Sequence, residues 1–172
     1  DWRARFAGRF REVGRFVMSR KMRICMHPDQ FVVLNSPDKA VVERSVAELR
    51  YHCDVLDAME LGVSAKVQIH VGGVYGDKPK AMARFERMVS SLPPSIARRL
   101  VVENDDRLFS LADCMAVSRR TGAPVVLDIF HHRCLNNGEI AAEALSLAAS
   151  TWRRRDGVPV VDYSSQQAGG RR

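Results

Sequence analysis

The sequence predicts an α/β protein built on a parallel β-sheet, and two observations support this. Short apolar segments alternate five times with segments of helical periodicity, which is the pattern of strand–helix units in parallel sheets. A polar residue able to bind a metal follows each apolar segment directly, so these residues recur with the units. Either a doubly wound sheet or part of a (β/α)₈ barrel would satisfy this pattern.

Composition limits the class of protein. The 172 residues are 46% hydrophobic and 27% charged, which is typical of one globular domain with a sizeable core. Lys and Arg outnumber Asp and Glu by 27 to 20, and the net charge of +7 favours a polyanionic partner. No apolar run approaches the ~18 residues of a membrane span, and no signal peptide begins the chain, so we expect a cytoplasmic protein without a membrane partner.

The cysteines do not form a metal or redox motif. They are far apart in the sequence with no C-x-x-C pair, which excludes a zinc ribbon and a thioredoxin-type motif. We expect all of them to be small buried hydrophobic residues in a reducing compartment. They are Cys25, Cys53, Cys114 and Cys134.

The first helix is predicted over residues 2–17. Apolar residues spaced by three to four positions share one face of it, and we expect this face to pack inward. They are Trp2, Phe6, Phe10, Val13 and Val17. A second helix is expected to start at the N-cap Ser36, with Pro37 in its first turn, and to end at Gly62.

The remaining units follow without an internal linker, so residues 1–172 are predicted to form a single domain. The predicted strands cover residues 22–26, 66–69, 100–102, 124–127 and 158–161. Further helices are expected over residues 82–89, 110–121 and 139–151. The glycine-rich loop 71–77 fits neither a dinucleotide-binding motif nor a P-loop, and we interpret it as letting the backbone approach a site.

The residues that end the strands predict a metal centre. They are His27, His70, Glu103, Asp128 with His131, and Asp162. Parallel strands present their carboxyl ends on one face, so these residues should converge although they are far apart in sequence. Clustered carboxylates and imidazoles need a positive charge between them, and this nitrogen and oxygen set suits Mn²⁺, Zn²⁺, Fe²⁺ or Mg²⁺. There are more ligands than one ion needs, which predicts two or three ions.

Five motifs, in order along nearly the whole chain, together resemble the UV damage endonuclease family. They are Met26-His-Pro-Asp-Gln-Phe31 with Leu34-Asn-Ser-Pro37, Ile69-His-Val-Gly-Gly-Val-Tyr-Gly-Asp-Lys78, Val102-Glu-Asn-Asp-Asp106, Asp128-Ile-Phe-His-His132, and Asp156-Gly-Val-Pro-Val-Val-Asp-Tyr-Ser-Ser165. The resemblance implies a TIM-type (β/α) barrel endonuclease. It would use a Mn²⁺ cluster to nick double-stranded DNA on the 5′ side of pyrimidine dimers and 6-4 photoproducts.

The resemblance also implies roles for individual residues. The matched metal-ligand positions are His27, His70, Glu103, Asp128 and His131. Glu103 would bridge ions, and the expected catalytic residues are Glu103, His70 and Asp128. Gln30 and Phe31 match the pair that probes the DNA lesion, although Phe31 could instead be a core residue that plugs its loop.

The sequence departs from the family in two ways. Where some members have a metal-site lysine followed two residues later by a ligand histidine, this chain has Val160 and Asp162, so Asp162 is the expected replacement ligand. The chain also accounts for about five of eight barrel strands. The resemblance places the first two strands before Asp1 and the last after Arg172, which predicts a partial barrel.

Two other functions stay open at this point. A divalent-metal sugar isomerase or epimerase could use the same barrel, because a fold does not determine its chemistry. A truncated barrel could also be inactive. The positive charge and the Gln30-Phe31 pair favour the nuclease, with UV-damaged DNA as the partner and no protein partner evident.

Overall fold

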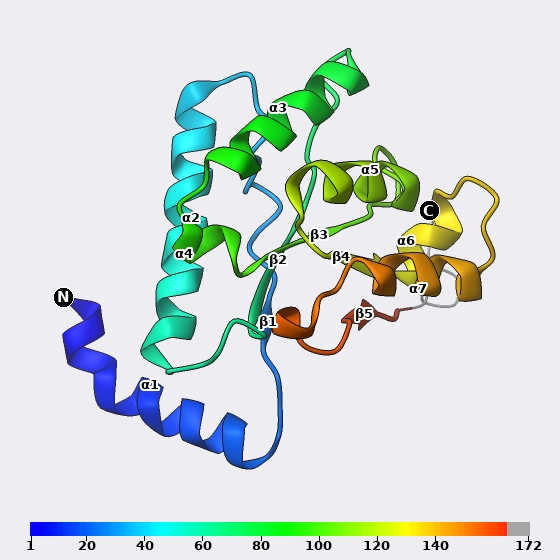
Figure 1. Cartoon of the computed structure of the whole chain (residues 1–172). Helices are drawn as coiled ribbons and strands as arrows, with labels where there is room; N and C mark the ends of the chain where they lie inside the picture. The colour runs from blue at the N-terminus through cyan, green and yellow to red at the C-terminus, as the bar shows by residue number, and fades with distance from the viewer. Residues whose placement is uncertain (165–172) are drawn as a thin grey trace, which may run out of the picture.

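Five parallel strands form a half-barrel in the computed structural model, which describes residues 1–164. The strands lie side by side in their sequence order, and helices cover the outer side of the sheet (Figure 1). The order contains no reversal point of the kind that defines a doubly wound sheet, so the barrel alternative is the correct one. Ser165, the last residue of the fifth motif, lies outside the described residues.

The register aligns the carboxyl ends of the strands. The strands are β1 (Cys25–Met26), β2 (Lys66–His70), β3 (Leu100–Glu103), β4 (Val125–Asp128) and β5 (Val161–Asp162). His70 pairs with Glu103 between β2 and β3, and Asp128 pairs with Asp162 between β4 and β5. Residues that end different strands therefore lie at one rim of the half-barrel.

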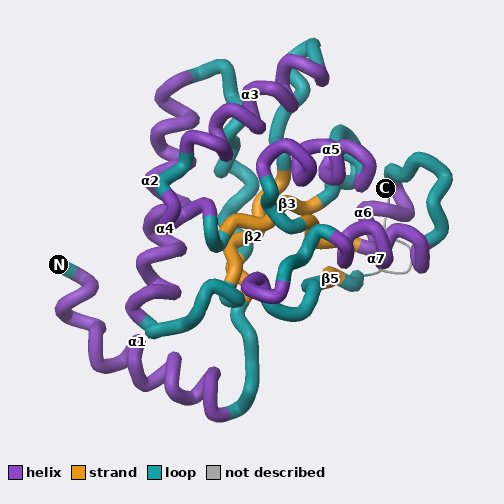
Figure 2. The backbone as a smooth tube through the Cα atoms, viewed as in Figure 1, coloured by secondary structure: helices purple, strands orange, loops and turns teal. Residues whose placement is uncertain are grey.

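Helices connect the strands around the outside, as the tube in Figure 2 shows. They are α1 (Trp2–Ser19), α2 (Lys39–Ala58), α3 (Lys78–Ser91), α4 (Pro94–Ala97), α5 (Leu111–Thr121), α6 (Ile129–Cys134) and α7 (Ala141–Ser150), with a 3₁₀ turn, η1 (Arg154–Asp156). The core lies between β2, β3, β4 and these helices. Leu49 and Leu56 of α2 and Phe85 of α3 are fully buried in it, each contributing about 1.5–3 kcal/mol through burial.

Two predicted boundaries are wrong at the second helix. Asp38, not Ser36, is the N-cap, because its Oδ1 accepts the backbone N–H of Ala40 at 2.8 Å. The Ser36 hydroxyl accepts the backbone N–H of Asp38 at 3.1 Å, which makes Ser36 part of the preceding turn. The helix ends at Ala58, before Gly62.

The first and last strands are shorter than predicted. β1 and β5 have two residues each, where the sequence predicts strands over residues 22–26 and 158–161. The carbonyl of Val158 accepts a hydrogen bond from the Arg23 guanidinium. β5 begins three residues later, at Val161.

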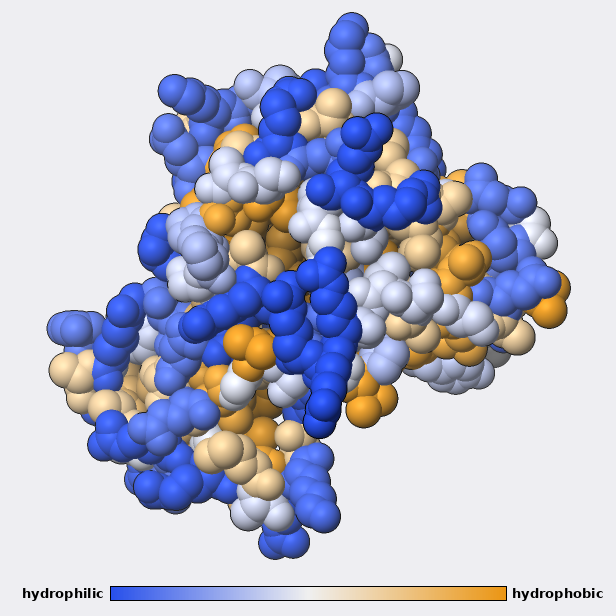
Figure 3. Space-filling model, viewed as in Figure 1, coloured by the Kyte–Doolittle hydropathy of each residue, from blue (hydrophilic) through white to orange (hydrophobic). Residues whose placement is uncertain are grey.

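Helix α1 packs less of its apolar face than the sequence predicts. Val17 is buried, but Phe6 and Val13 are 46% and 43% exposed, because α1 packs mainly on α2. Gly14 allows this packing, since a Cβ there would lie 1.8 Å from the carbonyl oxygen of Met59. The surface in Figure 3 is mostly hydrophilic with separate hydrophobic patches, including one near its lower end, where Figure 1 shows α1.

The expectation that every cysteine is buried is also wrong. Cys53 and Cys114 are buried and Cys25 is partly buried, but Cys134 is exposed because it ends the short surface helix α6. Among the described helices, none combines the length and the apolar character that crossing a bilayer requires.

Two buried cations hold the opposite end of the strands from the predicted metal ligands. Lys66, the first residue of β2, is 0% exposed, and its Nζ donates to Asp156 Oδ1 at 2.6 Å and to the carbonyl of Arg98 at 2.9 Å. Arg99, just before β3, is 1% exposed and pairs with Asp57 at 2.5 Å. These pairs tie the start of β2 and β3 to the surrounding helices and turns.

Candidate metal centre

Five of the predicted ligands converge at the carboxyl ends of the strands. They form two groups, His27 with His70 and Glu103, and Glu103 with Asp128 and His131. Within each group the potential ligand atoms lie within 4.8 Å of one another. Glu103 belongs to both groups, so its carboxylate is the shared element of the cluster.

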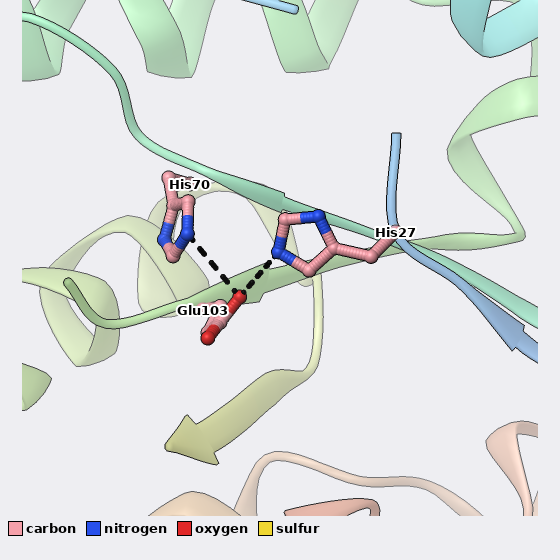
Figure 4. A group of neighbouring side chains, drawn as sticks. All are labelled: His27, His70 and Glu103. Carbon is pink, nitrogen blue, oxygen red and sulfur yellow. Dashed lines mark hydrogen bonds and ion pairs between the residues drawn. The ribbon is translucent and has the colours of Figure 1, made fainter. Parts of the chain in front are cut away.

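Three histidine rings surround the Glu103 carboxylate. His27 Nε2 lies 2.8 Å and His70 Nε2 lies 3.5 Å from Glu103 Oε2, and Figure 4 shows both rings directed at this oxygen. His131 Nδ1 lies 3.3 Å from the other oxygen, Oε1. Glu103 is only 2% exposed, whereas the His27 side chain is 42% exposed, so the carboxylate is buried beneath partly exposed rings.

The charges of the cluster are strongly coupled. Burial of Glu103 favours its neutral form, but hydrogen bonds from His131 and His27 and the nearby charge of His70 outweigh it and hold the pKa of Glu103 below its ordinary value. The hydrogen bond to Glu103 raises the pKa of His131 to about 9 and also raises the pKa of His27. The buried carboxylate thus favours the protonated forms of His27 and His131.

His27 is oriented to offer one nitrogen to a metal. Its Nδ1 lies 2.9 Å from the backbone carbonyl of Pro28, which places the proton on Nδ1. Nε2, which faces Glu103, is then the nitrogen left for a metal. A backbone carbonyl that fixes the tautomer in this way is typical of metal-binding histidines.

Asn104 joins the ends of β3 and β4 beneath the second group. Its side chain accepts the backbone N–H of Asp128 at 2.9 Å and donates to the carbonyl of Asp128 at 3.2 Å. The carboxylate of Asp128 caps α6 by accepting the backbone N–H of His131 at 2.8 Å. The ring of His131 is held by the carbonyl of Asn104, 2.9 Å from Nδ1.

Asp162 lies beside the cluster but outside both ligand groups formed by residues 1–164. Gln68 connects them, since its Nε2 donates to Glu103 Oε2 at 2.8 Å and to Asp162 Oδ2. Burial raises the pKa of Asp162, an effect that the hydrogen bond from Gln68 opposes. Asp162 as a metal ligand therefore stays a prediction. The sequence analysis missed Gln68, and the signal for it was the alternation of the polar residues Lys66, Gln68 and His70 with apolar ones along β2.

The loop after β1 presents the predicted lesion-probing pair. Phe31 is 76% exposed and Gln30 is exposed too, so the interpretation of Phe31 as a core residue is wrong. The loop is ordered by its own backbone, with the N–H of Val32 donating to the carbonyl of Asp29 at 3.0 Å. Phe31 thus stands in solvent four residues beyond His27.

The glycine-rich loop packs closely against the loop after β1. Gly72 has a φ of +110°, and a Cβ there would lie 2.5 Å from Asn35 Oδ1. The amide of Asn35 donates to the carbonyl of Gly73 at 2.8 Å and accepts its N–H at 3.2 Å. These glycines let the loops after β1 and β2 pack together beside the histidines.

The chemistry of these residues fits a divalent metal cluster. Imidazole nitrogens and carboxylate oxygens without thiolates suit Mn²⁺, Zn²⁺ and Fe²⁺. Within the described residues, the buried Nδ1 of His70 has no hydrogen-bond partner. Two groups of three ligands that share one carboxylate are an arrangement able to hold two ions.

Metal affinity should depend steeply on pH. Metal and proton compete for the same ring nitrogens, and the pKa of His131 is raised to about 9, so Mn²⁺ affinity should increase between pH 6 and 9. One displaced proton corresponds to about tenfold in Kd per pH unit. The same raised pKa stabilises the metal-free fold below about pH 6.5, and this contribution is lost as the pH rises through about 9.

Isothermal titration with Mn²⁺ checks this prediction, in two buffers of different ionisation enthalpy so that released protons are counted. We expect proton release at pH 7. A Kd that is constant across this pH range would contradict it.

Comparison with known proteins shows extensive similarity in sequence. The UV-endonuclease UvdE family matches residues 1–172. The UV DNA damage endonuclease of Clostridium perfringens is 37% identical over 168 residues, covering 96% of this chain and 41% of the relative. That of Bacillus pumilus is 34% identical over 170 residues, covering 98% of this chain and 53% of the relative. The chain thus spans about half the length of these relatives.

Comparison with solved structures also shows similarity to a UV damage endonuclease. The crystal structure of SacUVDE superposes with a TM-score of 0.94 at 44% identity, covering 99% of this chain and 57% of that protein. D-psicose 3-epimerase from Clostridium cellulolyticum H10 has a TM-score of 0.63 at 15% identity, over 84% of this chain and 55% of that one, which shows a shared fold alone. From its match over the whole length and the relatives above 30% identity, the chain belongs to the UvdE family of UV endonucleases.

Proposed function

We propose that this chain carries the metal centre and the lesion-probing loop of an endonuclease that nicks UV-damaged DNA in the cytoplasm. The observation that supports this best is the buried Glu103 carboxylate, surrounded by three histidines at one rim of a UvdE-family barrel. The relatives carry the name UV DNA damage endonuclease. The proposed reaction is cleavage on the 5′ side of pyrimidine dimers and 6-4 photoproducts.

The proposed cofactor is a cluster of two or three divalent ions, with Mn²⁺ as the metal. The residues proposed to hold it are His27, His70, Glu103, Asp128, His131 and Asp162. When bound, the ions supply positive charge to the phosphodiester and lower the pKa of water at the site. Glu103, His70 and Asp128 are the proposed catalytic residues, because they are partly or fully buried at the strand ends, where they keep fixed positions.

The loop beside the metal centre is proposed to recognise the lesion. Dimerised pyrimidines pair and stack poorly, so extruding them costs less than extruding normal bases, and an inserted side chain can fill the gap. Phe31 offers an exposed flat ring, and the amide of Gln30 can both donate to and accept from unpaired bases. The net charge of +7 would strengthen binding to the phosphate backbone.

A defined substrate tests this function. A labelled duplex with one pyrimidine dimer is incubated with the chain, with and without Mn²⁺, beside a version extended at both ends to the length of its relatives. We expect the extended version to nick the duplex on the 5′ side of the dimer when Mn²⁺ is present, and not to nick undamaged duplex. Failure of the extended version to nick would reject the proposal, whereas nicking by that version alone would assign activity to the complete barrel.

A metal-dependent sugar epimerase is the second candidate, because proteins named as D-psicose 3-epimerases share the fold. The two candidates differ in their partner. A nuclease should bind duplex DNA with an affinity that falls steeply as salt increases, and an epimerase should convert ketoses without binding DNA.

Phe31→Ala should weaken lesion binding while the fold and the metal content are unchanged. The loss expected for one stacking contact is about 1–3 kcal/mol, or roughly 5- to 150-fold in Kd for the dimer-containing duplex. Phe16→Ala is a matched control, since Phe16 is another exposed phenylalanine (54%) but lies on α1. Unchanged lesion binding in Phe31→Ala, or an equal loss in both variants, would show that Phe31 is not the wedge.

A further inference from the structure

We propose that Gln68 is a positioning residue that holds the carboxylates of Glu103 and Asp162 in place for metal binding. The inference rests on the proposed metal centre and extends it to a residue of the barrel interior. Gln68 is the middle residue of β2 and is only 3% exposed. Strand side chains alternate between two faces, so Gln68 shares the inner face with Lys66 and His70.

A buried amide inside a strand is costly unless its polar atoms are paired. Both ends of the Gln68 side chain have partners. Nε2 donates to Glu103 Oε2 at 2.8 Å and to Asp162 Oδ2, so each N–H serves one carboxylate. Oε1 lies 3.4 Å from Cys25 Sγ and accepts from its thiol. Only one orientation of the amide satisfies all these contacts, because the two carboxylates require donors and the Cys25 thiol donates to the amide oxygen.

The two hydrogen bonds donated by Gln68 reduce the repulsion between the carboxylates of Glu103 and Asp162. Two carboxylates that approach each other in a site of low dielectric repel, and without donors one of them takes up a proton. The two N–H groups of Gln68 lie between Glu103 and Asp162, which come from β3 and β5. The contacts leave Asp162 Oδ1 and Glu103 Oε1 without a bond from Gln68. This side chain therefore sets where both carboxylates are offered to a metal.

Gln68→Met keeps the length of the side chain and removes both donated hydrogen bonds. Outer partners of metal ligands typically change affinity by 10- to 100-fold, and we expect a rise of that size in the Kd for Mn²⁺. The measurement is a Mn²⁺ titration followed by electron paramagnetic resonance of the free ion, with stoichiometry, at pH 8. Ser118→Ala is the control, since Ser118 is also buried but lies on α5.

A pair of variants at Cys25 gives a second measurement that does not change Gln68. Cys25→Ala removes the thiol that donates to the Gln68 amide oxygen, which loosens the amide and should raise the Kd several-fold. Cys25→Ser restores a donor and should return the Kd to the wild-type value. A role limited to packing would not produce this rescue, because Ala and Ser have nearly the same size.

The outcomes separate this inference from the metal centre itself. If wild-type protein took up no Mn²⁺, the metal centre would be rejected and this role of Gln68 with it. If wild type bound Mn²⁺ and Gln68→Met bound it within twofold, only the positioning role would be overturned. Should Gln68→Met fail to fold by circular dichroism, the Cys25 pair decides. Equal Kd values for Mn²⁺ in Cys25→Ala and Cys25→Ser would overturn the inference. A Kd restored by serine would support it.

Discussion

Replacing Glu103 by glutamine should remove most Mn²⁺ binding and all measurable nicking of dimer-containing DNA. Glu103 is shared by both ligand groups, and its carboxylate contacts His27, His70 and His131. Glutamine has nearly the same shape but no charge, and its NH₂ group would meet ring nitrogens where an acceptor is needed. We expect the Kd for Mn²⁺ to rise by at least about 100-fold, since even outer partners of ligands change affinity by 10- to 100-fold.

Glu43→Gln is the matched control for this prediction, because Glu43 is exposed on α2 and should bind metal as wild type does. Metal content and nicking are measured on the same preparations, with circular dichroism to confirm the fold. Wild-type affinity and activity in Glu103→Gln would reject the shared carboxylate as the centre of the site.

Asp156→Ala should cause the largest loss of stability, lowering the free energy of unfolding by about 3–5 kcal/mol. Asp156 is 4% exposed and pairs with the fully buried Lys66 at 2.6 Å. Burial lowers the pKa of Lys66, and its partner Asp156 opposes this change. Without Asp156 the ammonium group would keep only the carbonyl of Arg98, so a buried charge would be left uncompensated.

Urea denaturation measures this loss, and two further variants interpret it. Asp106→Ala breaks the exposed pair with Arg107 and should cost less than about 1 kcal/mol. Combining Asp156→Leu with Lys66→Met removes both charges and should recover much of the stability, since apolar replacements of buried ion pairs are often nearly neutral. If Asp156→Ala lowered the free energy of unfolding by less than about 1 kcal/mol, the Lys66–Asp156 pair would not be important for stability.

The architecture and the ligand cluster could be predicted because they depend on local pattern and chain order. Alternating strand and helix periodicities define parallel units, and parallel units bring every strand end to the same rim. For this reason His27, His70, Glu103, Asp128 and His131 could be placed together from positions spread over the chain. The resemblance in the motifs added the family, which the comparisons confirmed.

Features that depend on contacts between distant residues were decided only by the tertiary structure. The exposure of Phe31 depends on how its loop packs, and Asp38 replaces Ser36 as N-cap because of the turn that precedes α2. The bonds of Gln68 to Glu103 and Asp162 join residues of three different strands.

The buried pair of Lys66 with Asp156 likewise joins residues 90 positions apart. A sequence shows that such side chains are polar but not which partners surround them. Burying a polar group is favourable only with those partners in place, so the amide inside β2 and the cation at its start became interpretable once the strands were side by side. By itself the sequence determined the order of the barrel units and the residues at their ends, because both follow from periodicity along the chain. The tertiary structure alone decided which neighbours hold those residues in position, because hydrogen bonds and ion pairs depend on distances that folding sets.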